Sequence, residues 1–225
     1  MIDIFAITNT LKREIKQRIV GKSPYGNIQW MKADNDWYIK IHEKNRILHE
    51  NFIQYIKEKN DVKTVLEIGC GTGIYPIKYK ELFTNMNYTG IDISKENIDY
   101  CKKNSNFNFI CNDFLTMNAS QKYDLVFSHA VIDHVYDIDV FISKICQSCK
   151  KYAYINSYRG YFPNLKKHKM KWRDDDGCYY NNISVDQIKQ TLLKNNLKNI
   201  EFTISHLDNE DGLSQTVIKI HKNDF

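Results

Sequence analysis

Short apolar runs alternate along the middle of the chain with stretches in which apolar residues recur every three or four positions. Five runs have the length and the bounding turn residues of buried strands. They are Val62–Ile68, Asn87–Asp92, Asn106–Cys111, Tyr123–Ser128 and Tyr152–Asn156. Helical periodicity falls between them, at Ile74–Phe83, Lys95–Asn104 and Ile138–Lys150. This alternation predicts a doubly wound α/β sheet, because parallel strands are joined by helical crossovers.

The C-terminal part has a different pattern. A helix is predicted at Val185–Asn195, and two strand-like runs follow it, at Asn199–His206 and Ser214–His221. Only a polar, turn-rich linker separates these two runs, so they predict an antiparallel hairpin. Together with the five earlier strands they make an expected sheet of seven strands.

Two segments lie outside this alternation. Residues 1–60 are predicted to form two or more helices that flank an aromatic loop from Tyr25 to Tyr38. Residues 157–183 form a long connection that is rich in aromatic and charged residues. Connections of this length are usually functional or disordered. The aromatic residues favour an ordered lid, and the alternative is a surface excursion packed onto the sheet.

Composition narrows the class of protein. With 225 residues, 42% hydrophobic, 13% aromatic and 26% charged, the chain suits one large domain, or one domain with a small extension, and not a disordered protein. No run approaches the ~18 apolar residues of a membrane span. The net charge of +5 comes from a diffuse excess of Lys, so we do not expect a nucleic-acid partner. The six Cys form no disulfide framework. The only charge in the apolar stretch Met1–Ile7 is acidic, and the basic residues follow it from Lys12, unlike in a signal peptide, so we expect a cytoplasmic protein.

The strongest local signal is a glycine-rich turn directly after the first strand. Gly69, Gly71 and Gly73 open the next helix, where free backbone N–H groups can hold a ligand. The spacing does not fit the dinucleotide fingerprint, which needs two residues before its third glycine. The loop ending Gly-Lys-Ser/Thr that cradles phosphates is also absent.

Two acids extend this signal. Asp92 ends the second strand, 21 residues after Gly71, where a carboxylate can accept both hydroxyls of a ribose. Asp113 lies just past the third strand and is followed by Phe114, so that a carboxylate and an aromatic wall could receive an adenine. The alternative is that both acids cap turns. Together, the glycine turn and the two acids suit a ligand that contains an adenosine but no pyrophosphate.

At these residues the sequence resembles the class I S-adenosylmethionine (SAM)-dependent methyltransferases, in their small-molecule branch. The resemblance covers roughly residues 60–221 and rests on four motifs in order. These are Glu67–Gly73, Ile91–Ile93, Asn112–Phe114 and Tyr123–Val135. The resemblance implies a Rossmann-like fold and SAM as cofactor. It divides the chain into an N-terminal helical cap, 1–60, and a SAM-binding domain, 61–225, with 157–183 as a lid over the methyl acceptor.

The resemblance also implies roles for single residues. Glu67 and the glycines at 69, 71 and 73 would hold the methionine moiety, and Asp92 the ribose. Ile93, Asp113 and Phe114 would surround the adenine. Ser128 and His129 would contact the cofactor at the end of the fourth strand. No metal is expected, since Cys146 and Cys149 have no second Cys/His pair.

Methyl transfer from a sulfonium is a direct displacement, so the protein mainly aligns the groups and excludes water. A hydroxyl acceptor also benefits from a base. The candidate bases are His129, Asp133 and His134. His129, interpreted as the first residue past the fourth strand, is preferred. For His134 the alternative is a structural role at the start of the next helix.

The two extra segments are expected to bind the methyl acceptor. From the N-terminal segment we predict contacts by aromatic side chains, namely Tyr25, Trp30, Trp37 and Tyr38. From the lid we predict Tyr158, Arg159 and Trp172. Arg159 follows the fifth strand, and its guanidinium would suit an anionic acceptor.

The predicted activity is therefore methyl transfer to an oxygen or nitrogen of a small polar metabolite. An RNA or protein methyltransferase is the main alternative, although the Pro-containing signature of base-amine methylation is missing after the fourth strand. A SAM-binding scaffold without catalysis, or an aminopropyl transferase of the same fold, is a third. Oligomeric state is not predicted.

Overall fold

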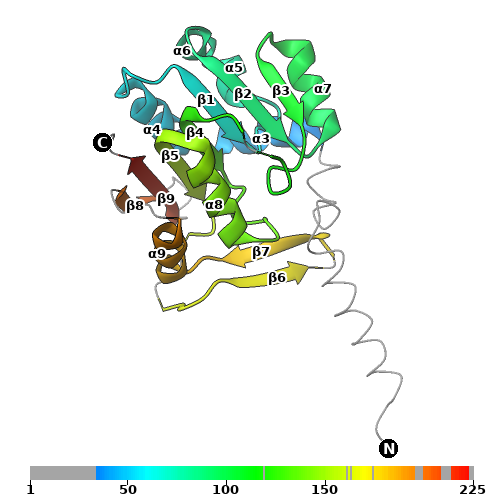
Figure 1. The fold of residues 1–225 in the computed structure, drawn as a ribbon. Helices are drawn as coiled ribbons and strands as arrows, with labels where there is room; N and C mark the ends of the chain where they lie inside the picture. Colours follow the sequence, from blue (N-terminus) through cyan, green and yellow to red (C-terminus); the bar gives the residue numbers. More distant parts are fainter. Residues whose placement is uncertain are drawn as a thin grey trace, which may run out of the picture.

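The main sheet contains seven strands of the described chain. The computed structural model describes residues 34–118, 120–160, 162, 164–173, 175–195, 200–208 and 214–222. The strands of the main sheet are β1 Thr64–Ile68, β2 Asn87–Asp92, β3 Asn108–Cys111, β4 Tyr123–His129, β5 Cys149–Ser157, β8 Ile200–Asp208 and β9 Ser214–Lys222. Their order across the sheet is β3-β2-β1-β4-β5-β9-β8 (Figure 1).

The pairing of the strands confirms the predicted fold class. Strands β1 to β5 run parallel to one another, and β9 is antiparallel to both β5 and β8. The chain thus forms a doubly wound, Rossmann-like α/β sheet that ends in an antiparallel hairpin. Strand order reverses between β1 and β4, and ligands of such sheets bind beside the carboxyl ends of the strands at this point.

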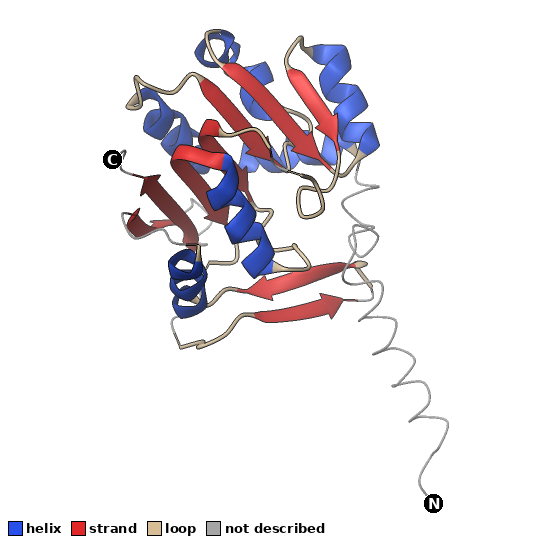
Figure 2. Cartoon of the chain, viewed as in Figure 1, coloured by secondary structure: helices blue, strands red, loops and turns tan. Residues whose placement is uncertain are grey.

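Helices cover both faces of the sheet (Figures 1 and 2). They are α3 Asn35–Lys44, α4 Arg46–Lys57, α5 Ile74–Lys78, α6 Lys80–Thr84, α7 Lys95–Asn104, α8 Ile138–Ser148 and α9 Val185–Lys194. Helices α8 and α9 pack against one face, with Leu66, Val126 and Ile155 of the sheet. Helices α4 to α7 pack against the other face, with Val65 and Phe127. This arrangement follows from the alternation of side chains along each strand.

Sequence signals place most helix starts correctly. Ser94 and Asp137 cap α7 and α8, since their side chains accept hydrogen bonds from backbone N–H groups of the first turn. The single helix predicted over Ile74–Phe83 is wrong. It divides at Tyr79, which leaves the helical region (φ −110°, ψ 38°) and accepts a hydrogen bond from the N–H of Leu82 only three residues ahead.

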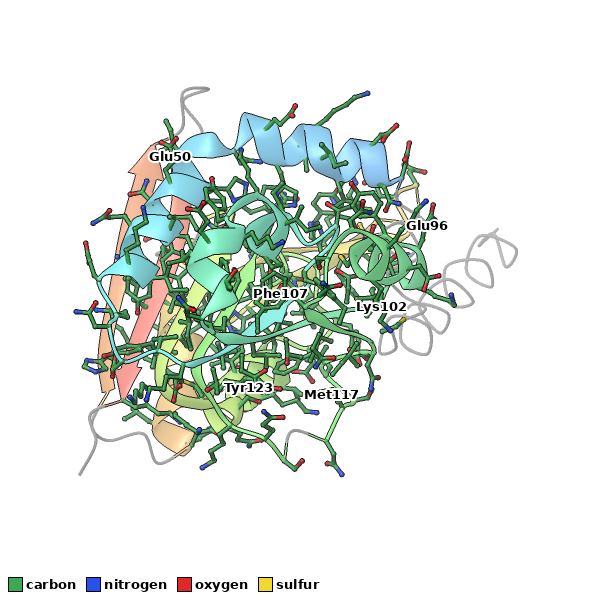
Figure 3. All side chains as sticks on the ribbon, turned by 90° about the horizontal axis from the view of Figure 1, so that it is seen from above. Glu50, Glu96, Lys102, Phe107, Met117 and Tyr123 are labelled. Carbon is green, nitrogen blue, oxygen red and sulfur yellow. The ribbon has the colours of Figure 1, made fainter. Side chains whose placement is uncertain are left out.

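The N-terminal segment joins the core of the sheet. Phe52 of α4 is fully buried, and its ring lies 4.3 Å from that of Phe127 on β4 and 5.0 Å from that of Tyr154 on β5. Helix α3 crosses the molecule between the labelled Glu50 of α4 and Glu96 of α7 (Figure 3). The domain boundary at residue 60 stays a prediction. Helix α4 supplies residues to the same core cluster as β1, β4 and β5.

The predicted aromatic loop extends too far, because it was expected to run to Tyr38 and helix α3 begins at Asn35. In helix α3, Asp34 caps the first turn by accepting a hydrogen bond from the N–H of Asp36, so Trp37 and Tyr38 lie on a helix.

None of the described helices is long and apolar enough to cross a bilayer.

The long connection after β5 contains a second, two-stranded sheet. It pairs β6 Lys169–Arg173 with β7 Cys178–Asn182 in antiparallel register. This hairpin lies apart from the main sheet, at the bottom of the view in Figure 1. The sequence patterns predict an ordered lid or a surface excursion here, and they do not indicate the two strands.

Candidate active site

The glycine loop runs from the end of β1 to the start of α5. Gly69, Gly71 and Gly73 all have positive φ, between 51° and 71°. The N–H groups of Gly69 and Cys70 donate to the carbonyl of Ile91, at 2.7 and 3.0 Å, and so attach the loop to β2. A Cβ at residue 69 would lie 2.2 Å from Cγ2 of Val131. Only glycine therefore allows the loop after β4 to approach this closely.

Asp92 lies against the glycine loop. One carboxylate oxygen accepts from the N–H of Gly71 and the other from the N–H of Ser94, both at 2.8 Å. The side chain is 7% exposed, and burial raises its pKa although these N–H groups counteract the rise. The structure thus brings together two motifs separated by 21 residues. The role of Asp92 toward a ribose stays a prediction.

Glu67 has a partner that the sequence does not indicate. Its buried carboxylate accepts a hydrogen bond from the hydroxyl of Tyr88 on β2. Burial raises the pKa of Glu67 well above its ordinary value, and the negative charge of Asp92 adds to the rise. Its predicted contact with the methionine moiety is not tested by these interactions.

The third motif, Asn112–Phe114, contains residues that contact other parts of the protein. Asp113 accepts from the N–H of Leu115 at 2.9 Å and from the hydroxyl of Tyr136 at 2.5 Å. Phe114 is 4% exposed and packs edge-to-face on Phe141 of α8, with ring centres 6.0 Å apart. These contacts favour the alternative in which Asp113 caps a turn, and they show that Phe114 packs in the core. The roles of both residues toward an adenine stay predictions. Ile93, by contrast, is only partly buried.

Three polar atoms near the carboxyl ends of β1 and β4 are buried without a hydrogen-bond partner among the described residues. They are Oγ1 of Thr72, Oγ of Ser128 and Nδ1 of His129. Buried polar groups are normally hydrogen-bonded, so such a group needs an explanation. A bound polar ligand at this edge would supply the missing partners.

His129 is the last residue of β4 and not the first residue past it. Its Nε2 lies 3.2 Å from the hydroxyl of Tyr75 on α5, and the two rings are stacked with centres 4.9 Å apart. Burial lowers the pKa of His129 well below its ordinary value, and His49 and His42 lower it further. A neutral imidazole can act as a base, whereas an imidazolium cannot.

His134 is held by the lid. Its Nδ1 lies 2.6 Å from the carbonyl of Tyr179, and its Nε2 lies 3.2 Å from the hydroxyl of Tyr158. Because both ring nitrogens have protein partners, the geometry favours the structural alternative. Its catalytic role stays a prediction.

The neighbouring Asp133 anchors the start of the lid. It is fully buried, and it accepts from the hydroxyl of Ser157 at 2.6 Å and from the N–H groups of Tyr158 and Arg159 at 3.3 and 3.2 Å. Asp133 belongs to the loop after β4. In the lid hairpin, the side-chain amide of Asn181 donates to two carbonyls of this loop, those of Val135 at 2.8 Å and Ile132 at 2.9 Å. These bonds place the hairpin beside the loop that follows β4.

Tyr158 and Arg159 bond to the loop after β4, and Arg159 and Trp172 contact other lid residues. Arg159 donates to the carbonyl of Asn181 at 3.2 Å and to the side chain of Asn182 at 3.0 Å, and its guanidinium covers the Tyr180 ring. Trp172 packs on Tyr179 at 5.2 Å. Tyr158 is 37% exposed and Arg159 is half-buried. Contact of these residues with a methyl acceptor stays a prediction.

From the N-terminal segment, Tyr38 reaches the glycine loop. Its ring lies 3.3 Å from the position that a Cβ of Gly71 would take. Burial raises the pKa of Tyr38, and the charge of Asp92 raises it further. Trp37 packs edge-to-face on Tyr38 and is 40% exposed. Tyr25 and Trp30 lie outside the described residues.

A hydrogen-bonded chain of side chains beside His129 was not predicted. Tyr75 connects His129 to His49 on α4, and His49 connects to His42 on α3. These residues are up to 87 positions apart, and no local pattern indicates their meeting. Among the described residues, no group of three or more His, Cys, Asp or Glu is arranged to hold a metal ion.

Comparison with known proteins identifies relatives of this chain. Residues 59–201 match the family described as "Methyltransferase domain". A malonyl-[acyl-carrier protein] O-methyltransferase of Ilyobacter polytropus is 38% identical over 85 residues, which is 36% of this chain and 33% of that protein. A ubiquinone biosynthesis O-methyltransferase of Rickettsia typhi is 30% identical over 129 residues, 54% of this chain and 51% of that protein.

Solved structures share the fold. The N-methyltransferase NodS of Bradyrhizobium japonicum, in complex with S-adenosyl-L-homocysteine (SAH), aligns with a TM-score of 0.60 at 14% identity, covering 86% of this chain and 95% of that one. The plantazolicin methyltransferase BpumL aligns at 0.62 and 15% identity, covering 94% and 99%. This chain spans about a third to a half of the length of the first curated relatives it matches. Since the family match extends over more than half of the chain, the protein belongs to the methyltransferase-domain family, as its motifs predicted.

Proposed function

We propose that the protein is a SAM-dependent methyltransferase that methylates an oxygen or nitrogen atom of a small polar metabolite. One observation carries the proposal: the Asp92 carboxylate lies on Gly71 of the glycine loop, at the point where the strand order of the sheet reverses. The curated relatives include a ubiquinone biosynthesis O-methyltransferase and a probable (S)-tetrahydroprotoberberine N-methyltransferase, which supports the acceptor class.

The residues of this edge fit the cofactor. SAM carries ribose hydroxyls, an amino acid group and an adenine, all of which need polar partners. Asp92 offers carboxylate oxygens, and Thr72 and Ser128 offer buried hydroxyls without a partner in the described part of the chain. Glycine at 69 and 71 leaves the backbone open to close approach. We assign Asp92 to the ribose and the loop 69–73 to the methionine moiety.

Bound SAM supplies a methyl group on a sulfonium, which leaves as a neutral thioether. The protein's own task is to orient the methyl acceptor and to exclude water. The lid, anchored through Asp133 and Asn181, and helix α3, which carries Tyr38, are the segments we assign to this task. His129, neutral because of its burial, is the base that we assign to a hydroxyl acceptor.

The test is product analysis with the purified protein. We expect SAH to form from SAM with small phenols or amines, and not with RNA or protein substrates. Mass spectrometry of the acceptor identifies an added methyl group. If only RNA or protein is methylated, the small-molecule assignment fails. Turnover only with decarboxylated SAM would instead identify an aminopropyl transferase.

A further inference from the structure

Four side chains from four different elements form one hydrogen-bonded chain beside the candidate site. His42 of α3 lies 3.2 Å from His49 of α4, measured from Nδ1 to Nε2. Nδ1 of His49 lies 2.5 Å from the hydroxyl of Tyr75, and that hydroxyl lies 3.2 Å from Nε2 of His129. The outer end, His42, is partly accessible to solvent, whereas His49 and Tyr75 are buried.

The number of protons on these four side chains limits which of them can donate each hydrogen bond. Tyr75 has one hydroxyl proton and two nitrogen partners, so it donates to one and accepts from the other. The shorter contact, to His49, indicates that Tyr75 donates there. His129 then donates from Nε2, and its Nδ1 keeps a lone pair. His49 in turn carries its proton on Nε2 and donates to Nδ1 of His42.

The surroundings keep these imidazoles neutral at pH 7. Burial is the main cause, and it lowers the pKa of His49 to about 3 and that of His42 to about 4. The cation of Lys78 on α5 lowers the pKa of both further. The titratable and charged side chains that act on the four-residue chain from the packed elements are Glu67, Lys78, Tyr79 and Tyr154.

The free end of the chain is Nδ1 of His129. This atom is buried, and it has no partner in the described part of the protein. It lies at the carboxyl end of β4, next to Ser128, whose hydroxyl also has no partner there. A neutral nitrogen with a free lone pair, at the edge of the sheet where ligands bind, is suited to take a proton.

We propose that His129, Tyr75, His49 and His42 form a proton relay, and that the methyl acceptor is therefore a neutral hydroxyl group, such as a phenol. The inference rests on the proposed function. As the oxygen–methyl bond forms and the sulfur–methyl bond breaks, the hydroxyl proton passes to Nδ1 of His129. The Nε2 proton of His129 moves to Tyr75, the Tyr75 proton to His49, the His49 proton to His42, and the outer His42 proton to water.

Other acceptor classes do not need such a relay. A carboxylate is already ionised at neutral pH and has no proton to lose. A neutral amine attacks through its lone pair without help from a base. A hydroxyl is the acceptor whose attack becomes easier when its proton is removed. In this scheme His129 is the catalytic base, and Tyr75, His49 and His42 are positioning residues that set its tautomer and accept its proton.

The first test needs no methyl acceptor. Nitrogen-15 NMR of the histidine rings in the free protein reports which nitrogen carries the proton. We expect neutral His129 at pH 7 with its proton on Nε2, and a changed tautomer balance of His129 and His49 in Tyr75→Phe. Tyr154→Phe is the matched control, because Tyr154 packs 5.5 Å from the His129 ring without belonging to the relay. A charged His129 at pH 7, or tautomers unchanged in Tyr75→Phe, would overturn the proposal.

The second test is kinetic, with catechol as the probe acceptor. Removing a base or its orienting partner costs up to the ~10²–10⁴-fold that general-base catalysis contributes. We expect Tyr75→Phe to lower kcat by about 10-fold or more with little change in the KM for SAM, and Tyr154→Phe to stay within about twofold of wild type. His42→Leu, at the partly exposed end, interrupts the relay without altering Tyr75 and should also lower kcat.

The pH profile separates a relay from a structural effect. Ionised catechol needs no base, so the deficit of Tyr75→Phe should shrink as pH rises through the pKa of catechol. A deficit that is constant with pH, or an unchanged kcat in both variants, would overturn the relay. If wild type methylates no probe at all, the proposed function fails, and the NMR result still decides the state of the relay.

Discussion

Replacing Asp133 with asparagine should flatten the pH dependence of stability. Asp133 is fully buried, and burial raises its pKa from 3.8 to about 6, although the hydroxyl of Ser157 and the N–H groups of Arg159 and Tyr158 counteract the rise. Between these two pH values the unfolded chain has lost the proton that the folded protein still holds. Stability due to this group is therefore complete below pH 3.8 and is lost as pH rises to about 6.

The size of the effect follows from the shift. A rise of about two units, at 1.36 kcal/mol per unit, corresponds to about 3 kcal/mol. Asparagine cannot ionise, so the free energy of unfolding of Asp133→Asn, relative to wild type, should increase by about 3 kcal/mol between pH 4 and pH 7. The difference between the two proteins matters here, because Glu67 and Asp92 also have raised pKa values and titrate in both.

Urea unfolding of both proteins across this pH range measures the difference. Asp124→Asn is the control with the opposite sign. Burial of Asp124 raises its pKa, but the N–H groups of Lys63 and Thr64 outweigh it, so the pKa is lowered and its stabilisation is lost as pH falls. If the wild-type and Asp133→Asn curves run parallel with pH, Asp133 does not bury a charge, and the account of the lid anchor is wrong.

Two further predictions concern packing and the glycine loop. Phe52→Ala should lower the free energy of unfolding by about 3–5 kcal/mol, because its fully buried ring contacts Phe127; urea denaturation measures this, and a loss below about 1 kcal/mol would show that α4 is not part of the core. Gly69→Ala should lower the melting temperature and weaken SAH binding, since its Cβ would meet Val131 at 2.2 Å; unchanged values in calorimetry would contradict the close approach of the two loops.

Much of the fold could be predicted because the relevant signals are local. Strand β2 and helix α7 have the predicted bounds, since a buried run and a capped amphipathic stretch each depend on neighbouring residues. The hairpin β8–β9 was predicted from a missing helix pattern. The break at Tyr79 and the hairpin β6–β7 were not predicted. The hairpin is attached to the loop after β4 through Asn181, and no local pattern indicates that contact.

The candidate site also contains some residues that local patterns predict and others that depend on tertiary contacts. The glycine loop and Asp92 could be predicted together because a fixed spacing along the chain carries the signal. The partners of Glu67 and His129 could not, because Tyr88 and Tyr75 meet them only through the order of the strands and the packing of α5. Phe114 packs on Phe141 in the core, and an aromatic residue beside an acid is also typical of a core position, so its predicted contact with an adenine stays a prediction.

The central claim is that Asp92 and the glycine loop bind the adenosine part of SAM. Calorimetric titration with SAH tests it directly, in wild type, in Asp92→Ala, and in Asp124→Ala as a control at the opposite end of the strands. Two hydrogen bonds to a charged group contribute about 3–6 kcal/mol. We therefore expect Asp92→Ala to weaken SAH binding by about 100-fold or more, and Asp124→Ala to bind like wild type. Wild-type affinity in a folded Asp92→Ala protein, or no SAH binding by wild type, would contradict the account.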